Sequence, residues 1–535
     1  MIGRLQKGFA LLFVALLGIT STQLANAQSD PNKSLKKFIA TVQYIRYAYV
    51  DSVNEPEIIE NAIVETLKEL DPHSSYIPAD EVKKANEPLQ GSFEGIGVTF
   101  QIYKDTIRVI APIPGGPSES VGVMAGDKIV KIDGEEATGD DINNQFVFDH
   151  LRGKKGTEVD ITVYRTSTDN MIDFTIVRDK IPINSIDASF MATPEIGFIK
   201  VTRFSLSTVD EFREKLAELK AKGMKKLILD LRGNPGGYML PGIELADEFI
   251  KEDRLLLYTE GLRSPVQKFH SDPGGDFEEG KLVILINEGS ASSSEIVAGA
   301  VQDLDRGLII GRRSFGKGLV QKPFQLPDGS IIRLTTARYH TPTGRCIQKS
   351  YEEGVDEYYM DIYKRLKHGE LVNPDSISFP DSLKYRTPND RLVYGGGGIM
   401  PDIFVPWDSS EVTDYFVDLI RKGIVNSYVM DYVDENRSDI LSAYPELDDF
   451  VENFRVSQPM FEALVAEARE KDVTTDQEEL DKSEEIVRYR VKALIARNIW
   501  DVSAFYHVIS EIDDEFLMAI EVLNNPEKFQ KLTKK

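Results

Sequence analysis

The chain has 535 residues, more than one hydrophobic core supports, so several domains are expected. Hydrophobic residues make up 41% of it, which is typical of folded globular proteins. The formal charge of −24 argues against nucleic-acid binding, because phosphate recognition needs a basic surface. The single cysteine, Cys346, excludes an intramolecular disulfide, and the six scattered histidines lack zinc-peptidase spacing, so no metal or cofactor is expected.

The first 27 residues have the pattern of a secretory signal peptide. Arg4 and Lys7 precede an apolar run over 9–19, which is shorter than the roughly 20 residues that span a bilayer. The small-x-small pattern Ala-Asn-Ala at 25–27 is a cleavage site for signal peptidase. The sequence therefore predicts export to the periplasm or the cell exterior, and an uncleaved membrane anchor is the alternative.

The rest of the chain changes character along its length. Residues 34–70 place apolar side chains at helical spacing, whereas 91–180 contain short alternating runs that predict a compact β-rich module. Residues 196–345 alternate strand and helix, which favours an α/β layer structure. Residues 350–395 are polar and irregular and have the character of an insertion, and 410–535 are helical and acidic in pattern.

A serine-rich turn over 287–295 joins a buried strand to a helix. A serine at such a turn lies at the positive end of the helix, beside free main-chain N–H groups that can stabilise an oxyanion. Ser292 is therefore a candidate nucleophile for acyl transfer. Because serine-rich turns are common helix N-caps, a purely structural role explains the same pattern.

A serine nucleophile needs a base, and nothing in the sequence marks His270 or His340 as that base. Burial can lower the pKa of a lysine by several units, so a buried neutral lysine is the alternative. Lys317 lies between two glycines that allow close approach of the main chain, although a lysine in such a turn is usually solvated.

One competing motif overlaps this lysine. Ser314-Phe315-Gly316-Lys317 matches the S-x-x-K pattern of penicillin-binding enzymes. That pattern requires serine and lysine one helical turn apart, and the glycines at 316 and 318 weaken a helix here. The same pattern also occurs by chance at residues 34–37.

Two glycine turns could supply main-chain donors. The turn over 230–237 follows a buried strand and ends in Pro-Gly-Gly, which makes it a candidate second half of an oxyanion hole. Residues 95–98 precede the first strand of the β-rich module, where successive N–H groups can form a nest for a carboxylate. Each is by itself compatible with an ordinary turn.

Taken in order, these segments resemble the carboxyl-terminal processing peptidases, also called tail-specific proteases, over most of residues 34–405. The motif Leu-Asp-Pro-His-Ser-Ser-Tyr at 70–76 is similar to the one that follows the family's N-terminal helices. Residues 122–134 resemble part of a PDZ domain, and 95–98 resemble its carboxylate-binding loop. The turn at 230–237, the serine run and the Gly-Lys-Gly segment resemble the protease core.

The resemblance implies a role for individual residues of this chain. Ser292 would be the nucleophile, Lys317 its general base 25 residues later, and Gln321 the residue that orients the lysine. The oxyanion hole would consist of the Ser293 amide and an amide of the Asn-Pro-Gly-Gly turn, with the choice between Gly236 and Gly237 left open. The family often has alanine where this chain has Ser293, but only the main chain of that residue is needed. Substrate tails would bind at Gly95, Ile96, Gly97 and Val98.

The expected fold class is multidomain α+β with a crotonase-like α/β protease core. The expected domains are a signal peptide (1–27), an N-terminal helical segment (28–88), a PDZ-like domain (89–180), a Ser-Lys peptidase core with an insertion at about 350–395 (181–405), and a helical C-terminal region (406–535).

The expected function is that of an exported serine endopeptidase that binds the free C-termini of proteins or peptides and cleaves near them. A non-catalytic PDZ scaffold or chaperone and a crotonase-like acyl-CoA enzyme are the alternatives. No nucleic-acid partner is expected. The sequence leaves open an adaptor protein and a homo-oligomer formed through the helical segments.

Overall fold

The computed structural model describes residues 32–534 except 167, 409 and 411, so the predicted signal peptide lies outside the described residues. The chain divides into two compact units, Met1–Leu70 and Asp71–Lys535. In the first unit, α2 (Lys33–Ala48) precedes α3 (Glu55–Lys68), and Arg46 pairs with Glu55 at 2.5 Å. Helix α2 leaves several large apolar and aromatic side chains exposed, among them Leu35, Phe38, Tyr44 and Tyr47.

The second unit is built around a six-stranded sheet in the order β10-β11-β12-β15-β16-β21. All neighbours in it are parallel except the pair β10 and β11. The strands are β10 (Ile186–Thr193), β11 (Ile196–Val201), β12 (Lys226–Asp230), β15 (Lys281–Ile286), β16 (Leu308–Gly311) and β21 (Ile403–Phe404).

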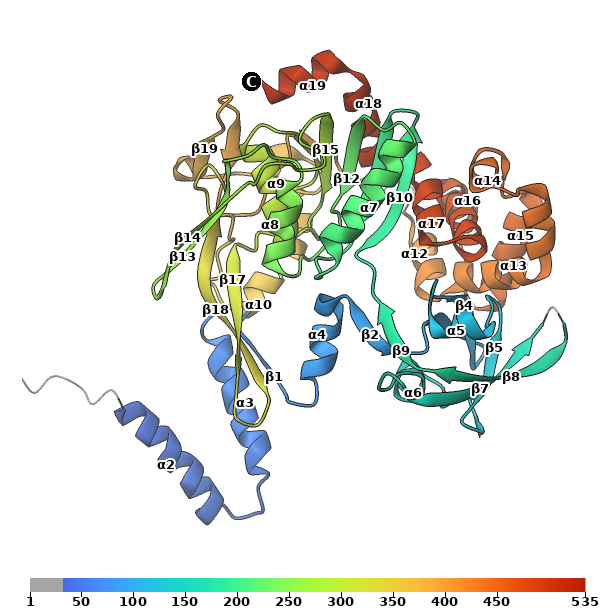
Figure 1. The fold of residues 1–535 in the computed structure, drawn as a ribbon, viewed down its shortest axis with the longest axis horizontal. Coiled ribbons are helices and arrows are strands. Elements are labelled where there is room, and N and C mark those ends of the chain that lie inside the picture. The colour runs from blue at the N-terminus through green and yellow to red at the C-terminus, as the bar shows by residue number, and fades with distance from the viewer. Residues whose placement is uncertain (1–31, 167, 409, 411, 535) are drawn as a thin grey trace, which may run out of the picture. The chain divides into compact units, whose positions relative to one another are not determined.

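Both faces of this sheet are buried, as expected for strands that are hydrophobic along their whole length. Leu227, Leu229 and Ile284 point to one face, which is covered by α7 (Thr208–Ala221), α8 (Met239–Asp247) and α9 (Ser293–Asp303). Ile228 and Val283 point to the other face, where α18 (Asp514–Asn524) from the C-terminal region packs with its apolar side chains Phe516, Ala519, Val522 and Leu523. Figure 1 shows the red α18 beside the green strands.

A second sheet has the order β1-β18-β13-β14, and β17 also pairs with β18. Its strands are β1 (Ser75–Ile77), β13 (Leu255–Gly261), β14 (Ser264–His270), β17 (Leu319–Gln325) and β18 (Ile331–His340). Strand β17 begins two residues after Lys317, so this sheet positions the chain on the far side of the glycine-flanked lysine.

The β-rich module forms a sheet in the order β3-β4-β5-β7-β8, with β6 paired to β5. Its strands are β3 (Val98–Tyr103), β4 (Thr106–Pro112), β5 (Lys128–Ile132), β6 (Glu135–Glu136), β7 (Glu158–Arg165) and β8 (Asn170–Val177), and its helices are α5 (Pro117–Val121) and α6 (Asn144–Leu151). Two short strands, β2 (Ser92–Gly95) and β9 (Asp179–Pro182), pair next to it, and α4 (Val82–Gln90) precedes them.

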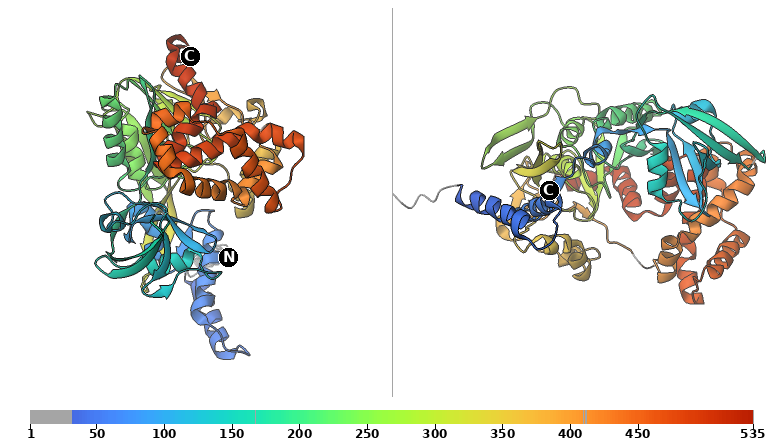
Figure 2. Two further views of the ribbon diagram at one scale, coloured as in Figure 1. Left: turned by 90° about the vertical axis from the view of Figure 1, so that its right-hand side faces the viewer. Right: turned by 90° about the horizontal axis from the view of Figure 1, so that it is seen from below.

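The polar segment between the core strands is ordered into short elements: α10 (Val355–Tyr359), α11 (Asp361–Lys367), two 3₁₀ turns (Pro374–Ser376, Asp381–Leu383), β19 (Lys384–Arg386) and β20 (Leu392–Tyr394). Helices then dominate to the C-terminus (orange to red in Figure 2). They are α12 (Asp414–Arg421), α13 (Ile424–Ala443), α14 (Leu447–Asn453), α15 (Gln458–Glu470), α16 (Gln477–Ile499), α17 (Val502–Ile509), the 3₁₀ turn Ser510–Ile512, α18 and α19 (Pro526–Thr533).

The architecture is thus multidomain α+β, and the fold class expected from the sequence is confirmed. Helices α12 to α17 share their own hydrophobic core, centred on buried residues such as Val429, Phe450 and Leu494. None of the helices in the described range is long and apolar enough to cross a membrane.

Candidate active site

Three turns meet at one edge of the six-stranded sheet. Strands β12, β15 and β16 are parallel neighbours, so the turns that leave their carboxyl ends lie side by side. The first turn carries Gly236 and Gly237, the second carries Ser292, and the third leads to Lys317. The topology therefore gathers candidate residues that the chain separates by up to 81 positions.

Ser292 occupies the N-cap of α9 in a conformation that serine rarely adopts. Its φ is +55° and its ψ is −113°, outside the regions favoured by residues with a side chain. Strain of this kind persists only where surrounding contacts enforce it, and it is concentrated at functional sites. Here the Ser292 amide donates to Glu295 Oε2 at 2.9 Å, and the Tyr339 hydroxyl donates to the Ser292 carbonyl at 3.2 Å.

Lys317 lines the same small cavity as Ser292. This cavity of about 130 Å³ is also lined by Gly237, Gln321 and Tyr339. Burial lowers the pKa of Lys317, and the positive charge of Arg333 acts in the same direction, while Asp71 and Glu295 oppose them. The surroundings of Lys317 thus favour the neutral amine, the form that can accept a proton.

Gln321 connects Lys317 to the segment that begins the second unit. Its Oε1 accepts a hydrogen bond from Lys317 Nζ at 3.2 Å, and its Nε2 donates to the main-chain carbonyl of His73. The His73 ring contacts the Tyr358 hydroxyl at 2.8 Å, and burial, reinforced by the charge of Lys317, lowers the pKa of His73 to about 4. The histidine of the 70–76 motif is therefore neutral near pH 7 and holds Gln321 through its carbonyl.

Glu295 is the carboxylate on which the nucleophile turn and the lysine loop converge. It is fully buried and accepts from the Ser292 and Lys317 amides, from the Gly316 amide at 2.7 Å and from Ser314 Oγ at 2.5 Å. Burial raises the pKa of Glu295, and these donors oppose that shift by favouring the anion. This residue lies in the serine-rich run, but we assigned it no role from the sequence. The S-x-x-E spacing of a capping box could have revealed it.

Main-chain donors face Ser292 from the Pro-Gly-Gly corner. The Gly236 amide already donates to Asn234 Oδ1 at 2.8 Å. The amides of Gly237 and Ser293, in contrast, meet no acceptor among the described residues. Gly236 has a φ of +92°, and a Cβ added to it would lie 2.7 Å from Ser292 Cβ, so only glycine allows this corner to approach the serine.

Ser293 contributes a further link through its side chain. Its hydroxyl donates to the Tyr238 carbonyl at 2.9 Å, which ties the start of α9 to the residue that follows Gly237. The serine that stands here in place of the family's alanine is therefore fully buried and hydrogen-bonded.

The segment over 350–395, which had no predicted role, contacts the loop that carries Lys317. The buried Arg365 donates to the carbonyls of Arg313 and Ser314, at 2.7 and 3.1 Å. Lys349, which precedes the segment, lies 4.0 Å from the Phe315 ring centre and 4.1 Å from that of Tyr358. Arg365 and Lys349 thus both contact the loop that carries Lys317.

The competing S-x-x-K interpretation does not fit the structure. Ser314 and Lys317 lie in an extended loop rather than on one helical turn. The Ser314 hydroxyl is fully buried, donates to Glu295 and accepts from the Ile399 amide at 2.6 Å. It is engaged on both sides and closed to a substrate.

A groove on the β-rich module is lined by apolar side chains. Its lining residues are Phe93, Ile96, Gly97, Val98, Phe100, Val147, Phe148, Leu151 and Arg152. Gly95 does not line the groove, since it ends β2 and pairs with Asp179. The Gly97 amide, at a φ of +75°, has no acceptor within the described ranges and is available to a ligand.

Parts of the chain match known protein families. Residues 195–358 match the model of peptidase family S41, and 95–176 match that of the PDZ domain. Residues 415–501 match a family of unknown function. A carboxy-terminal-processing protease of Bartonella bacilliformis is 35% identical over 341 residues, which cover 63% of this chain and 78% of that protein. The chain belongs to the carboxy-terminal processing proteases of peptidase family S41.

A second relative is also named a carboxy-terminal processing protease. Carboxy-terminal processing protease CtpB of Bacillus subtilis is 32% identical over 61% of this chain and 68% of its own length. Among solved structures, a photosystem II D1 C-terminal processing protease is 28% identical over 57% of this chain and 83% of its own, with a TM-score of 0.33. The PDZ domain of a Vibrio cholerae carboxy-terminal protease in complex with a peptide covers 17% of this chain and 97% of its own at 31% identity, with a TM-score of 0.16. As a member of this family, the S41 protein is a serine-type peptidase with a PDZ domain that acts on protein or peptide substrates.

Proposed function

We propose that this S41 protein is an exported endopeptidase that captures the free C-terminal tails of proteins on its PDZ domain and cleaves them near the C-terminus. Ser292 is the nucleophile and Lys317 is the general base. The observation that carries the proposal is that a strained serine and a lysine of lowered pKa line the same cavity.

The reaction follows the chemistry of acyl transfer. Ser292 Oγ attacks the scissile carbonyl carbon, and its proton passes to Lys317 Nζ as the new C–O bond forms. When the tetrahedral intermediate collapses, the C–N bond breaks and the Lys317 ammonium returns the proton to the leaving amine. Water then hydrolyses the acyl-enzyme, with Lys317 again as the base. Gln321 orients the amine for these transfers through its bond to Nζ.

The Ser293 and Gly237 amides form the oxyanion hole of this proposal. Both lack an acceptor among the residues described, whereas the Gly236 amide is occupied by Asn234. Gly236 contributes instead by allowing the corner to approach Ser292. Two preorganised donors at this position stabilise the developing charge when the serine attacks.

The PDZ groove supports recognition of a tail with an apolar last residue. The walls formed by Phe100, Val147 and Phe148 suit an apolar side chain, and the free Gly97 amide suits a terminal carboxylate. Gly95 supports this loop from β2, and Ile96 and Val98 flank the glycine.

We retain the predicted domains as part of the proposal, with the signal peptide (1–27) cleaved and the protein acting in the periplasm or cell exterior. The helical segments offer surfaces to further partners, a second copy of the chain or an adaptor. The exposed apolar side chains of α2 favour a second copy of the chain as the partner.

One experiment tests the activity. A purified protein that lacks residues 1–27 is incubated with a peptide that has an apolar free C-terminus, and cleavage is followed by mass spectrometry. The wild type should cleave, and Ser292→Ala and Lys317→Ala should abolish cleavage with unchanged circular dichroism. Lys317→His should not restore activity. Full activity of Ser292→Ala would refute the mechanism.

A second measurement addresses the alternative of a non-catalytic scaffold. A fluorophosphonate probe should label the wild type at Ser292 and leave Ser292→Ala unlabelled. A wild-type protein that binds the peptide but neither cleaves it nor reacts with the probe would favour the scaffold.

A further inference from the structure

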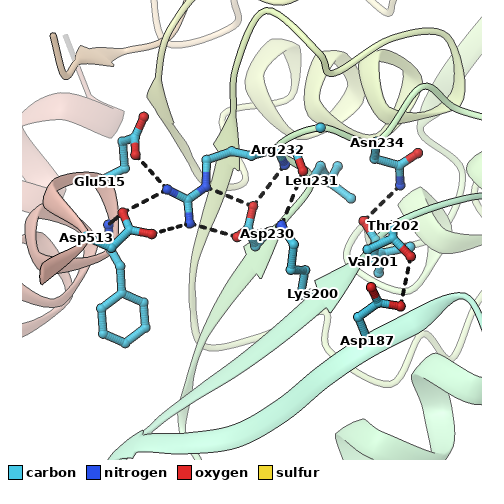
Figure 3. A network of polar contacts seen from close by, with 12 residues as sticks. Asp187, Lys200, Val201, Thr202, Asp230, Leu231, Arg232, Asn234, Asp513 and Glu515 are labelled. Atoms are coloured by element: carbon cyan, nitrogen blue, oxygen red, sulfur yellow. Dashed lines mark hydrogen bonds and ion pairs between the residues drawn. The ribbon is translucent and has the colours of Figure 1, made fainter. Parts of the chain in front are cut away.

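The N-terminus of α18 brings two carboxylates to the edge of the sheet that carries the candidate active site. Asp513 caps this helix by accepting from the Phe516 amide at 3.1 Å, and Glu515 lies in its first turn. Both residues are more than 190 positions from Lys317 in the chain, yet both bind Arg232 (Figure 3), and Glu515 also binds Arg312.

The first of these arginines belongs to the oxyanion turn. Arg232 binds Asp513 with both terminal nitrogens, at 2.8 and 2.7 Å, and Glu515 Oε2 with one of them, at 2.6 Å. It also binds Asp230 at the end of β12. Only 14% of the Arg232 side chain is exposed, and its carboxylate neighbours raise its pKa well above the ordinary value despite burial.

The second arginine belongs to the lysine loop. Arg312 directly follows β16 and donates to Glu515 Oε1 at 2.5 Å. It also donates through Nε to Glu288 Oε2 at 3.0 Å, and Glu288 lies four positions before Ser292. Glu515 therefore uses one oxygen for the oxyanion turn and the other for the lysine loop, which is in turn tied to the nucleophile turn.

We infer that Glu515, together with Asp513, is a positioning element that sets the relative places of the three catalytic turns, so that the C-terminal region is part of the catalytic machinery. The inference rests on the proposed function of these turns. A misplacement of about 1 Å between catalytic groups can lower a rate by roughly 100-fold. Glu295 already joins the nucleophile turn to the lysine loop, and Glu515 adds a direct link between the lysine loop and the oxyanion turn.

Apolar contacts also hold α18 on the sheet. Its apolar side chains cover the sheet in a continuous buried cluster that includes Ile228, Val283, Leu285 and Phe516. Buried ion pairs often contribute little net stability, because desolvation of the charges offsets their attraction. The carboxylates are therefore better explained by the geometry that they impose on Arg232 and Arg312 than by attachment of the helix.

Glu515→Gln tests the inference at constant side-chain volume. A glutamine offers one acceptor oxygen and one donor amide, so it can serve one arginine and must face the other with a like donor. The matched control is Asp514→Asn, since Asp514 lies between the two carboxylates, is exposed, and forms no ion pair with the described residues.

The readouts are kcat and KM for a peptide, the rate of Ser292 labelling by a fluorophosphonate, and amide hydrogen exchange in the three turns and in α18. For Glu515→Gln we expect kcat and the labelling rate to fall by about 10-fold or more, with KM within about twofold. Exchange should increase in 312–318 but not in α18. Asp514→Asn should behave as the wild type.

Arg312→Lys gives a second route should Glu515→Gln fold poorly. It keeps the positive charge but loses the fork that reaches Glu515 and Glu288 together, and the same loss of kcat is expected. Wild-type kcat in a folded Glu515→Gln or Arg312→Lys protein overturns the inference while leaving the proposed function intact. A wild-type protein that neither cleaves nor labels at Ser292 refutes the proposed function instead.

Discussion

The main-chain amides of Ser292 and Lys317 donate to the same oxygen of one buried carboxylate, Oε2 of Glu295, each at 2.9 Å. The nucleophile and the general base of the proposed mechanism are therefore held in register by their main chains. This shared anchor sets the relative places of the two main chains, and Gln321 then directs the lysine side chain through its bond to Nζ.

Glu295→Gln should impair both activity and stability. An amide nitrogen in place of one carboxylate oxygen would face donors such as the Gly316 amide, and a buried donor without an acceptor costs about 1–3 kcal/mol. We expect kcat to fall by about 100-fold. The free energy of unfolding in urea should fall by about 1–3 kcal/mol. Glu244→Gln, at an exposed position on α8, serves as the control and should change neither. Retention of both properties in Glu295→Gln would contradict the shared-anchor role.

The two glycines of the Pro-Gly-Gly corner should not tolerate a side chain. In Gly236→Ala the new Cβ would press on Ser292 Cβ, and in Gly237→Ala it would collide with the Phe204 carbonyl. Both variants should lose cleavage and probe labelling. Gly233→Ala is the control from the same turn, since its φ of +69° costs about 1–2 kcal/mol but nothing lies within 4 Å of the added atom. If Gly236→Ala cleaved as fast as Gly233→Ala, the close approach of this corner to Ser292 would be irrelevant to catalysis.

The pH dependence of cleavage should report the state of Lys317. Burial lowers its pKa below 10.5, and only the neutral amine accepts the proton of Ser292, so kcat/KM should fall as the pH decreases through that lowered pKa. The same shift affects stability: below the lowered pKa the buried charge costs free energy, and this cost disappears as the pH rises toward 10.5. Lys317→Met should be inactive yet more stable than the wild type at neutral pH, by an amount that shrinks at high pH. Equal stability of the two proteins at every pH would show that Lys317 is not desolvated.

Gln321→Glu should move this pH profile. A carboxylate next to Lys317 Nζ favours the ammonium, so the acidic limb should shift to higher pH, and the bond to the His73 carbonyl is lost with the donor amide. Gln321→Ala adds no charge, and it should lower kcat by about 10-fold. A profile of Gln321→Glu that superimposes on that of the wild type would exclude an influence of this residue on the lysine.

Recognition of substrate tails should depend on the free carboxylate. Amidation of the peptide C-terminus removes the charge that the Gly97 amide would bind, and Phe148→Ala removes part of the apolar groove. Each change should raise KM by about 10-fold and leave kcat nearly unchanged, because the groove is separate from the cavity at Ser292. Equal KM values for acid and amide peptides would eliminate the carboxylate contact.

The strand, turn and helix segments of the core could be anticipated because their signals are local. The buried strands expected before the turns at 230–237 and 287–295, and the helix expected after the second turn, correspond to β12, β15 and α9. The serine-rich turn and the Pro-Gly-Gly corner are likewise patterns of neighbouring residues, and the candidate nucleophile was chosen from the serine-rich turn.

The sequence by itself determined which side chains are present for the proposed chemistry, namely Ser292, Lys317 and Gln321, and the order in which they occur. Only the tertiary structure decided that Lys317 is desolvated, that the Gly237 amide rather than that of Gly236 is free, and that Glu515 joins Arg232 to Arg312. The physical reason is distance along the chain. Hydrophobic periodicity and turn chemistry act over a few residues, whereas burial and the pairing of Arg232 with Asp513 across 281 positions arise only when the sheet and α18 pack together.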